Sequence, residues 1–240
     1  MNEQPPETQQ PIKPPLAHPF EGEFQPMKST TFFSTADALL KHPAQIIYHL
    51  INSKEQRVLK YLSALLLICL FAMGLMMGSF SGGNQFWAVP LKIISGTFLS
   101  AVICLPSLYI LLCLSGGTQT FPQVSRLLLM GLSLAGILFI GFIPVVWIFS
   151  QSTNSTAFMG VLYLLVWGIG LFLGIQRINN AFEFINKKKM NVLRLWMVVL
   201  GLVILQMATS LRPLIGEYKP LEMNKKMFFM EHWFNVMGEE

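Results

Sequence analysis

The stretch LLLMGLSLAGILFIGFIPVVWIF, residues 127–149, decides the fold class because it runs for 23 residues without a charged side chain. An α-helix needs about 20 such residues to cross a hydrocarbon layer ~30 Å thick. Inside that layer every backbone N–H and C=O group must find a partner, which a helix provides within its own segment. The stretch therefore predicts a transmembrane helix.

Four further apolar stretches without charge surround it, at residues 62–80, 93–114, 157–175 and 195–211. The last is the shortest, and Leu214 and Ile215 extend it beyond Arg212, whose long side chain can reach the membrane interface. We therefore expect an all-α fold: a polytopic membrane bundle of five transmembrane helices.

The composition agrees with this fold class. Hydrophobic residues make up 53% of the 240 residues and charged residues only 12%, whereas soluble domains carry about 25% charged residues. No Asp or Glu lies between Glu55 and Glu183. Such a chain is not an ordinary soluble domain, because much of its surface must face something other than water.

The sequence divides into four segments. Residues 1–33 form a proline-rich tail that we expect to be disordered, because it has too little apolar surface to offset the entropy of ordering. Residues 34–60 are expected to form amphipathic interfacial helices, residues 61–216 the transmembrane domain, and residues 217–240 an amphipathic tail rich in aromatic residues and Met.

Two short helices are predicted before the first span. Ser34 is the expected N-cap of the first, with Asp37 three residues later. Pro43 should end this helix near His42 and begin the second, which runs to Asn52. The second helix is too short to span and has one apolar side, so we expect it to lie on the membrane surface; that side consists of Ile46, Ile47, Leu50 and Ile51.

The distribution of Lys and Arg predicts the orientation. With the N-terminus in the cytoplasm, the inner segments carry 12 basic residues and the outer segments 5. The strongest contribution is the loop 176–194, which contains Lys187, Lys188 and Lys189. By the positive-inside rule we expect an integral protein of a bacterial inner membrane, with its N-terminus cytoplasmic and its C-terminus outside.

The predicted spans offer no acid–base chemistry. All four histidines, His18, His42, His49 and His232, lie outside them, and so does every carboxylate. Ser133, in the run GLSLAG, has the setting of an intramembrane serine nucleophile but no histidine in a later span to act as its base. We therefore expect no catalytic residue, no cofactor and no metal site.

The spans do carry helix-packing signals. Gly74 and Gly78 form one GxxxG pair and Gly170 and Gly174 another, which would allow two helix backbones to approach closely. Such contacts can serve the internal bundle or a homo-oligomer, and the sequence leaves both open. Pro106 and Pro144, in the second and third spans, should kink their helices and could line a cavity or serve structure alone. The three cysteines, Cys69, Cys104 and Cys113, are expected to be buried free thiols.

The C-terminal tail is the expected partner surface, since aromatic side chains are enriched at interfaces. Its candidate residues are Phe228, Phe229, Trp233 and Phe234.

The overall layout resembles that of the Yip1 family of small polytopic membrane proteins. The resemblance covers residues 37–211 and rests on the helix ALLKHPAQIIYHL (38–50) before five spans, with Leu39-Leu40-Lys41-His42-Pro43 similar to the leucine–x–x–proline motif of bacterial members. The Asp-Leu-Tyr-Gly-Pro stretch of eukaryotic members has no counterpart. The run PLKIISGTFLSAVICLPSLY (90–109) is similar to uncharacterised bacterial membrane proteins, a family with no known activity.

These observations favour a non-enzymatic membrane scaffold or adaptor. The alternative is a permease-type subunit that depends on partner proteins for energy, and the missing acids and bases argue against an enzyme. A polar cavity along Pro106 and Pro144 would favour the permease, whereas tightly packed apolar helices would favour the scaffold. The expected partners are the lipid bilayer and either a second copy or other membrane proteins, and not nucleic acid.

Overall fold

A computed structural model describes residue 27 and residues 29–52, 56–81, 85–153, 155–186 and 191–210. These residues form seven α-helices, and no strand occurs among them. The helices are α1 (Phe32–Lys41), α2 (Pro43–Asn52), α3 (Gln56–Ser81), α4 (Gln85–Leu114), α5 (Phe121–Ser152), α6 (Thr156–Asn186) and α7 (Asn191–Ser210).

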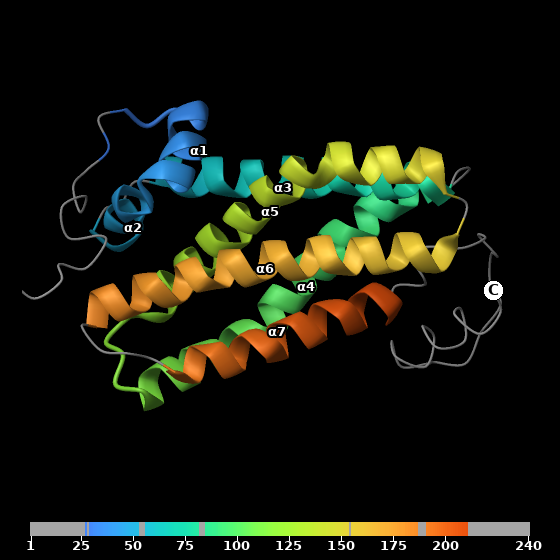
Figure 1. Cartoon of the computed structure of the whole chain (residues 1–240). Coiled ribbons are helices and arrows are strands. Elements are labelled where there is room, and N and C mark those ends of the chain that lie inside the picture. The colour runs from blue at the N-terminus through green and yellow to red at the C-terminus, as the bar shows by residue number, and fades with distance from the viewer. Residues whose placement is uncertain are drawn as a thin grey trace, which may run out of the picture.

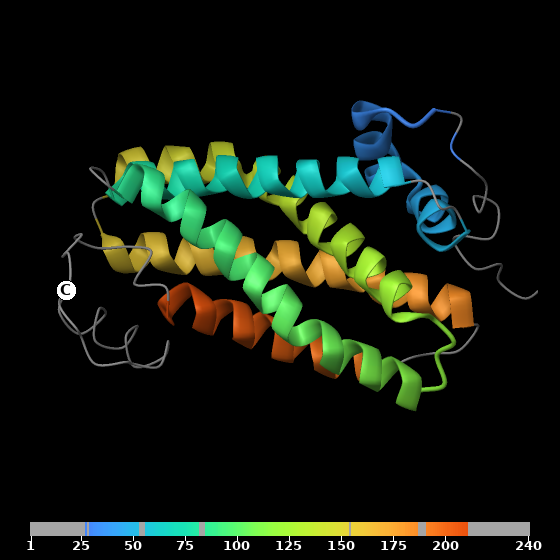
Figure 2. The same ribbon diagram turned by 180° about the vertical axis from the view of Figure 1, so that it is seen from behind.

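The five long helices lie side by side and alternate in direction along the bundle (Figures 1 and 2). The short helices α1 and α2 sit at the end where α3 begins, which we call the hairpin end, and α7 finishes at the opposite end. Helix α3 packs against both α4 and α5, α5 packs against α6, and α4 packs against α7. The contact between α6 and α7 is smaller.

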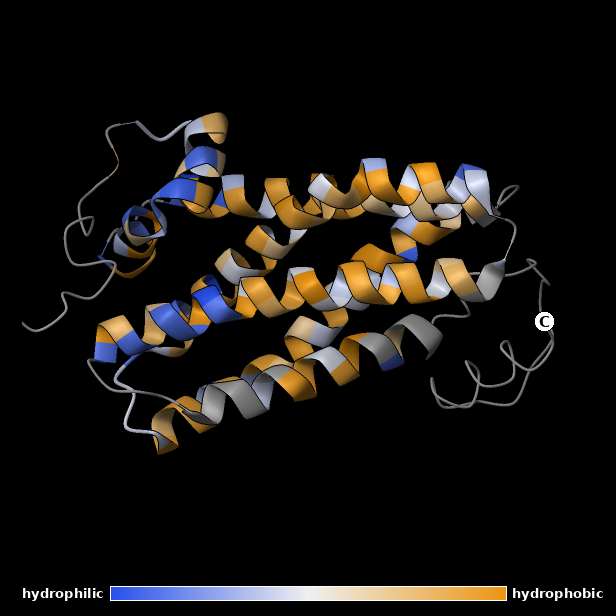
Figure 3. Cartoon of the chain, viewed as in Figure 1, coloured by the Kyte–Doolittle hydropathy of each residue, from blue (hydrophilic) through white to orange (hydrophobic). Residues whose placement is uncertain are grey.

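Four helices are long and apolar enough to cross a membrane: Gln56–Phe80, Phe86–Leu114, Phe121–Ser152 and Phe158–Asn186. Their outward faces carry large apolar side chains, such as Phe98 and Phe172, which are 69% and 62% exposed. Polar residues gather at the hairpin end, on α1, α2 and the last turns of α6 (Figure 3). The chain therefore has the architecture of a helical membrane protein.

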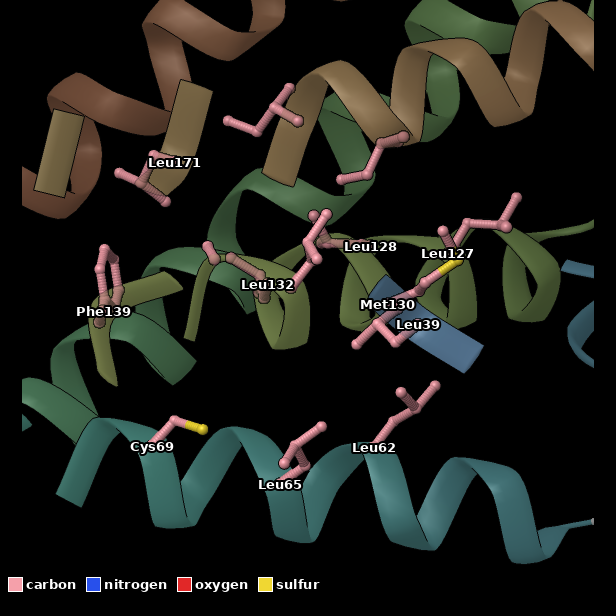
Figure 4. Close-up of a cluster of buried hydrophobic side chains, with 14 of the residues drawn as sticks. Leu39, Leu62, Leu65, Cys69, Leu127, Leu128, Met130, Leu132, Phe139 and Leu171 are labelled. Carbon is pink, nitrogen blue, oxygen red and sulfur yellow. The ribbon is translucent and has the colours of Figure 1, made fainter. Parts of the chain in front are cut away.

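The bundle has a continuous apolar core. Leu62, Leu65 and Cys69 point from α3 toward α5, where Leu127 and Phe139 belong to the same cluster (Figure 4). All three cysteines are free: Cys69 and Cys104 are buried at helix contacts, whereas Cys113 is exposed on an outward face, where only lipid could bury it. Cys113 lies on the outward face of α4, one residue before the helix ends at Leu114.

The helices extend beyond the apolar stretches that predicted them. Helix α4 begins at Gln85, before the apolar stretch 93–114, and α5 begins at Phe121, before the stretch 127–149. Helix α6 continues to Asn186, into the segment 176–194 that was expected as a loop. The reason is that an apolar stretch reports the thickness of the hydrocarbon layer, whereas a helix ends where its backbone hydrogen bonds end.

The first helix starts earlier than predicted. Thr31, not Ser34, is the N-cap: its side-chain oxygen accepts a hydrogen bond from the Ser34 N–H at 3.3 Å. The Ser34 hydroxyl instead donates to the Ser29 carbonyl, and Asp37 forms a salt bridge with Lys41 at 2.6 Å. The predicted end is confirmed, since α1 stops at Lys41 and α2 begins at Pro43.

The hairpin of α1 and α2 packs on the bundle through its apolar side chains. Leu39, Ile46 and Ile47 are fully buried, and Leu50 is nearly so. Both helices contact α3 and α5. The face that was expected to meet the membrane is therefore covered mainly by protein.

Candidate functional site

The first predicted packing pair lies where α3 meets α4. A Cβ atom added to Gly74 would stand 2.5 Å from the Cα of Pro90, so the two backbones are in direct contact there. Gly78, one turn further along α3, is buried. Pro90 cannot donate a backbone hydrogen bond, and its ring sits on the surface that the missing side chain of Gly74 leaves open.

The second pair lies where α5 meets α6. A Cβ on Gly174 would stand 2.5 Å from the carbonyl oxygen of Gly131, and a Cβ on Gly131 would stand 3.0 Å from the carbonyl oxygen of Gly174. One turn away, a Cβ on Gly170 would meet the ring of Phe139 at 2.3 Å. Gly170 and Gly174 thus face the internal bundle, so this contact joins two helices of one chain.

The candidate partner-surface residues Phe228, Phe229, Trp233 and Phe234 lie outside the described residues, as do the lysines of residues 187–189. Their predicted roles stay predictions.

Ser133 joins α5 to α3. It is fully buried, and its hydroxyl lies 3.0 Å from the Leu62 carbonyl oxygen and 2.7 Å from the Leu129 carbonyl oxygen of its own helix. A hydroxyl that donates to backbone carbonyls between helices is a packing element of membrane bundles. No histidine of the described residues lies in the five long helices.

A tryptophan joins α7 to α4. The indole N–H of Trp196 lies 2.9 Å from the Ser107 hydroxyl oxygen and 3.3 Å from the Cys104 carbonyl oxygen. Trp196 is 2% exposed. An indole buried this deeply needs a partner for its N–H, and α4 supplies two acceptors.

Two hydroxyls inside the long helices have no hydrogen-bond partner. Thr97 on α4 is 4% exposed and Tyr163 on α6 is 2% exposed, and neither side-chain oxygen is bonded. A buried polar group without a partner destabilises a fold by about 1–3 kcal/mol. The buried side-chain oxygen of Asn179 on α6 is also unbonded, so the interior is not purely apolar.

Pro106 and Pro144 both lie on exposed faces of their helices. They face away from the bundle interior. The scaffold and the permease therefore both stay predictions.

Two polar side chains of α5 fix the hairpin to the bundle. The Arg126 guanidinium donates to the Leu50 carbonyl at 3.2 Å, and the Gln123 amide lies 3.5 Å from the Ile51 carbonyl oxygen. The last carbonyls of α2 have no partner within their own helix, and a cation near a helix C-terminus is favourable. The first turns of α5 therefore cap the end of α2.

A second polar link at the hairpin end joins the α4–α5 connection to the last turn of α6. Gln119 and Asn186 exchange two amide hydrogen bonds, at 2.9 Å and 3.1 Å. Asn186 also donates to the Phe182 carbonyl at 3.0 Å. The Thr118 N–H also donates to the Asn186 side-chain oxygen at 3.4 Å, so this uncharged contact holds the α4–α5 connection against α6.

The two histidines of the hairpin lie in different surroundings. The Nε2 atom of His49 accepts the Met27 N–H at 3.0 Å, and His49 is buried, whereas His42 is exposed. Among the described residues no group of three His, Cys, Asp or Glu side chains could hold a metal ion. The arrangement at this end can position helices and present a surface.

No family model, curated protein or solved structure matches this chain. The resemblance to the Yip1 family therefore stays a prediction.

Sequence reasoning did not identify Arg126, Gln123 or Trp196 as important residues. Arg126 was counted only as one positive charge in an inner loop. The sequence contained one indication of this role. Arg126 stands at the start of an apolar helix, and a cation stabilises the C-terminal end of a neighbouring short helix when it lies beside it. Its partner, however, lies 76 residues away in the sequence.

Proposed function

We propose that the chain is an integral membrane scaffold or adaptor that performs no covalent chemistry. The observation that carries this proposal is the use of the interior for packing: α3, α4, α5 and α6 meet through glycines and a serine, while Pro106 and Pro144 face outward. A scaffold needs a rigid bundle that holds its exposed segments in place, and this interior supports that role.

In this proposal α7 (Asn191–Ser210) is the fifth span. It is a helix of 20 residues that packs along α4 and ends away from the hairpin. The N-terminal tail and the hairpin then face the cytoplasm of a bacterium, and residues 217–240 lie outside, as the distribution of Lys and Arg favours. The layout of the Yip1 family is the expected relationship.

The outer tail is the proposed partner surface, through Phe228, Phe229, Trp233 and Phe234. Deleting residues 217–240 should leave a chain that inserts and melts like the full chain but no longer co-purifies with its partners from mild detergent. A matched control is deletion of residues 1–26, which removes a similar length from the other end. Unchanged partner recovery without residues 217–240 would contradict this part of the proposal.

The permease-type subunit is the second candidate, and the unbonded hydroxyls of Thr97 and Tyr163 favour it, because a polar path would use such groups. Thr97→Val and Tyr163→Phe separate the two functions. A scaffold should tolerate both substitutions and become no less stable, because each removes an unsatisfied polar group. A permease should lose its cellular phenotype while the variant stays folded, which would overturn the scaffold.

A further inference from the structure

The outward face of α3 changes character along its length. Arg57 and Lys60 are exposed near its start, Tyr61 is half-buried beside them, and Leu67 and Ile68 are 49% and 54% exposed further along. At a rise of about 1.5 Å per residue, this change from basic to aromatic to apolar takes about 16 Å. Basic side chains, then an aromatic ring, then apolar groups is the order in which a helix enters a bilayer.

The first turn of α1 lies beside Tyr61. The ring of Phe32 meets the ring of Tyr61 edge to face, with their centroids 6.4 Å apart. Phe33, whose ring lies 5.6 Å from that of Phe32, is 82% exposed. The three rings thus form a row that leads from the side of α3 outward.

The exposed ring belongs to a fixed element. The opposite side of α1 buries Leu39 completely, and the end of α2 is held by Arg126. Figure 1 shows α1 standing out to the side of α3, beyond the edge of the bundle. A bilayer around α3 would therefore meet Phe33 at the headgroup level.

We propose that the first turn of α1 and the first two turns of α3 form a binding site for an anionic phospholipid of the surrounding leaflet. Arg57 and Lys60 hold the phosphate, and Phe33 packs against the upper part of the acyl chains. This site requires the bundle to span a membrane but does not depend on the scaffold role.

Charge and continuity favour a lipid over a protein occupant. Within the described residues no carboxylate forms a salt bridge with Arg57 or Lys60. The carboxylate of Asp37, on α1, forms its salt bridge with Lys41 of the same helix. The patch continues without a break into the apolar face of Leu67 and Ile68, which needs acyl chains around it. Basic residues at such a boundary are attracted to anionic headgroups.

The test is lipid titration of the detergent-purified full chain, followed by native mass spectrometry. Dioleoyl phosphatidylglycerol should bind more tightly than dioleoyl phosphatidylcholine. Each basic residue near an anionic surface changes binding about fivefold, so Arg57→Gln with Lys60→Gln should weaken phosphatidylglycerol binding roughly 25-fold and leave phosphatidylcholine unchanged. Phe33→Ser should weaken both lipids, and Phe33→Leu should restore most of the binding.

The matched control is Lys188→Gln with Lys189→Gln, which removes the same charge from the sequence that follows α6 and should keep the preference for phosphatidylglycerol. All substituted side chains of the proposed site are exposed, so unchanged melting will show that the variants are folded. Equal binding of both lipids by the natural chain would overturn the proposal. So would loss of the preference in the control alone, or a dimer of the natural chain that Phe33→Ser converts to monomer, because the patch would then belong to a second copy.

Discussion

Replacing Gly174 by alanine tests the backbone contact between α5 and α6. The added Cβ would stand 2.5 Å from the Gly131 carbonyl oxygen, whereas ordinary contact begins at 3.4 Å. The helices must therefore separate by about 0.9 Å at this point, the difference between these two distances. A carbonyl group of a helix cannot rotate away as a side chain can, so the strain has no local release.

The expected cost follows from two opposing effects. Overpacking a well-packed interior costs about 1–3 kcal/mol, while Gly→Ala within a helix gains up to about 1 kcal/mol from helix propensity. Gly168, on the same helix and with open space around it, receives only the gain. The difference between Gly174→Ala and Gly168→Ala should therefore be about 1–3 kcal/mol, with Gly174→Ala the less stable.

Thermal unfolding of the purified chain in detergent measures this difference. For chains of 150–250 residues, 1 kcal/mol corresponds to about 2–4 °C, so Gly174→Ala should melt roughly 2–12 °C below Gly168→Ala. Equal melting temperatures for the two variants, or a gain in both, would refute a close contact at Gly174.

Three further predictions concern the hydrogen bonds of Trp196, the cap formed by Arg126 and the orientation in the membrane. Trp196→Phe keeps an aromatic ring but removes the indole N–H and the pyrrole ring, so it should lower stability by at least about 1 kcal/mol and increase proteolysis within α7, whereas Trp147→Phe on an exposed face should change neither. Arg126→Gln should increase hydrogen exchange at the end of α2 and leave exchange in the centre of α5 unchanged; unchanged exchange in α2 would contradict the cap. In whole cells with single cysteines, a thiol at Lys188 should be protected and one at Gly238 should react with a reagent that cannot cross the membrane; the reverse pattern would invert the orientation.

The fold class and the turn between the first two helices were predictable from local chemistry alone. A long run without charge has few solutions in a membrane, and Pro43 both ends one helix and begins the next. The start of α1 was not predictable in the same way. Thr31 and Ser34 are both good N-caps, and the choice of Thr31 accompanies the packing of Phe32 on Tyr61, a contact between separate helices.

The polar part of the structure lay beyond sequence reasoning for a related reason. The hydrogen bonds of Arg126 and Trp196 join segments 76 and 92 residues apart. No pattern within either segment names its partner, because the pairing depends on how the helices are placed around one another. The glycines were easier to find, because a GxxxG spacing within one helix indicates that the backbone of another helix packs closely against it.

The helices of the bundle meet through two kinds of contact, which differ in how much movement of one helix against the other they tolerate. Gly74, Gly131 and Gly174 bring α3 to α4 and α5 to α6 at backbone distance, where any added atom must move a helix. The contact between α7 and α4 includes the Trp196 side chain, whose indole N–H lies within hydrogen-bond distance of the Cys104 carbonyl oxygen and the Ser107 hydroxyl oxygen. A side chain can follow a small movement of its helix and keep its hydrogen bond, whereas two touching backbones cannot move closer. The Trp196 contact can therefore tolerate a small shift of α7 that the glycine contacts between the other helices cannot, and α7 is also the helix that leads into residues 217–240.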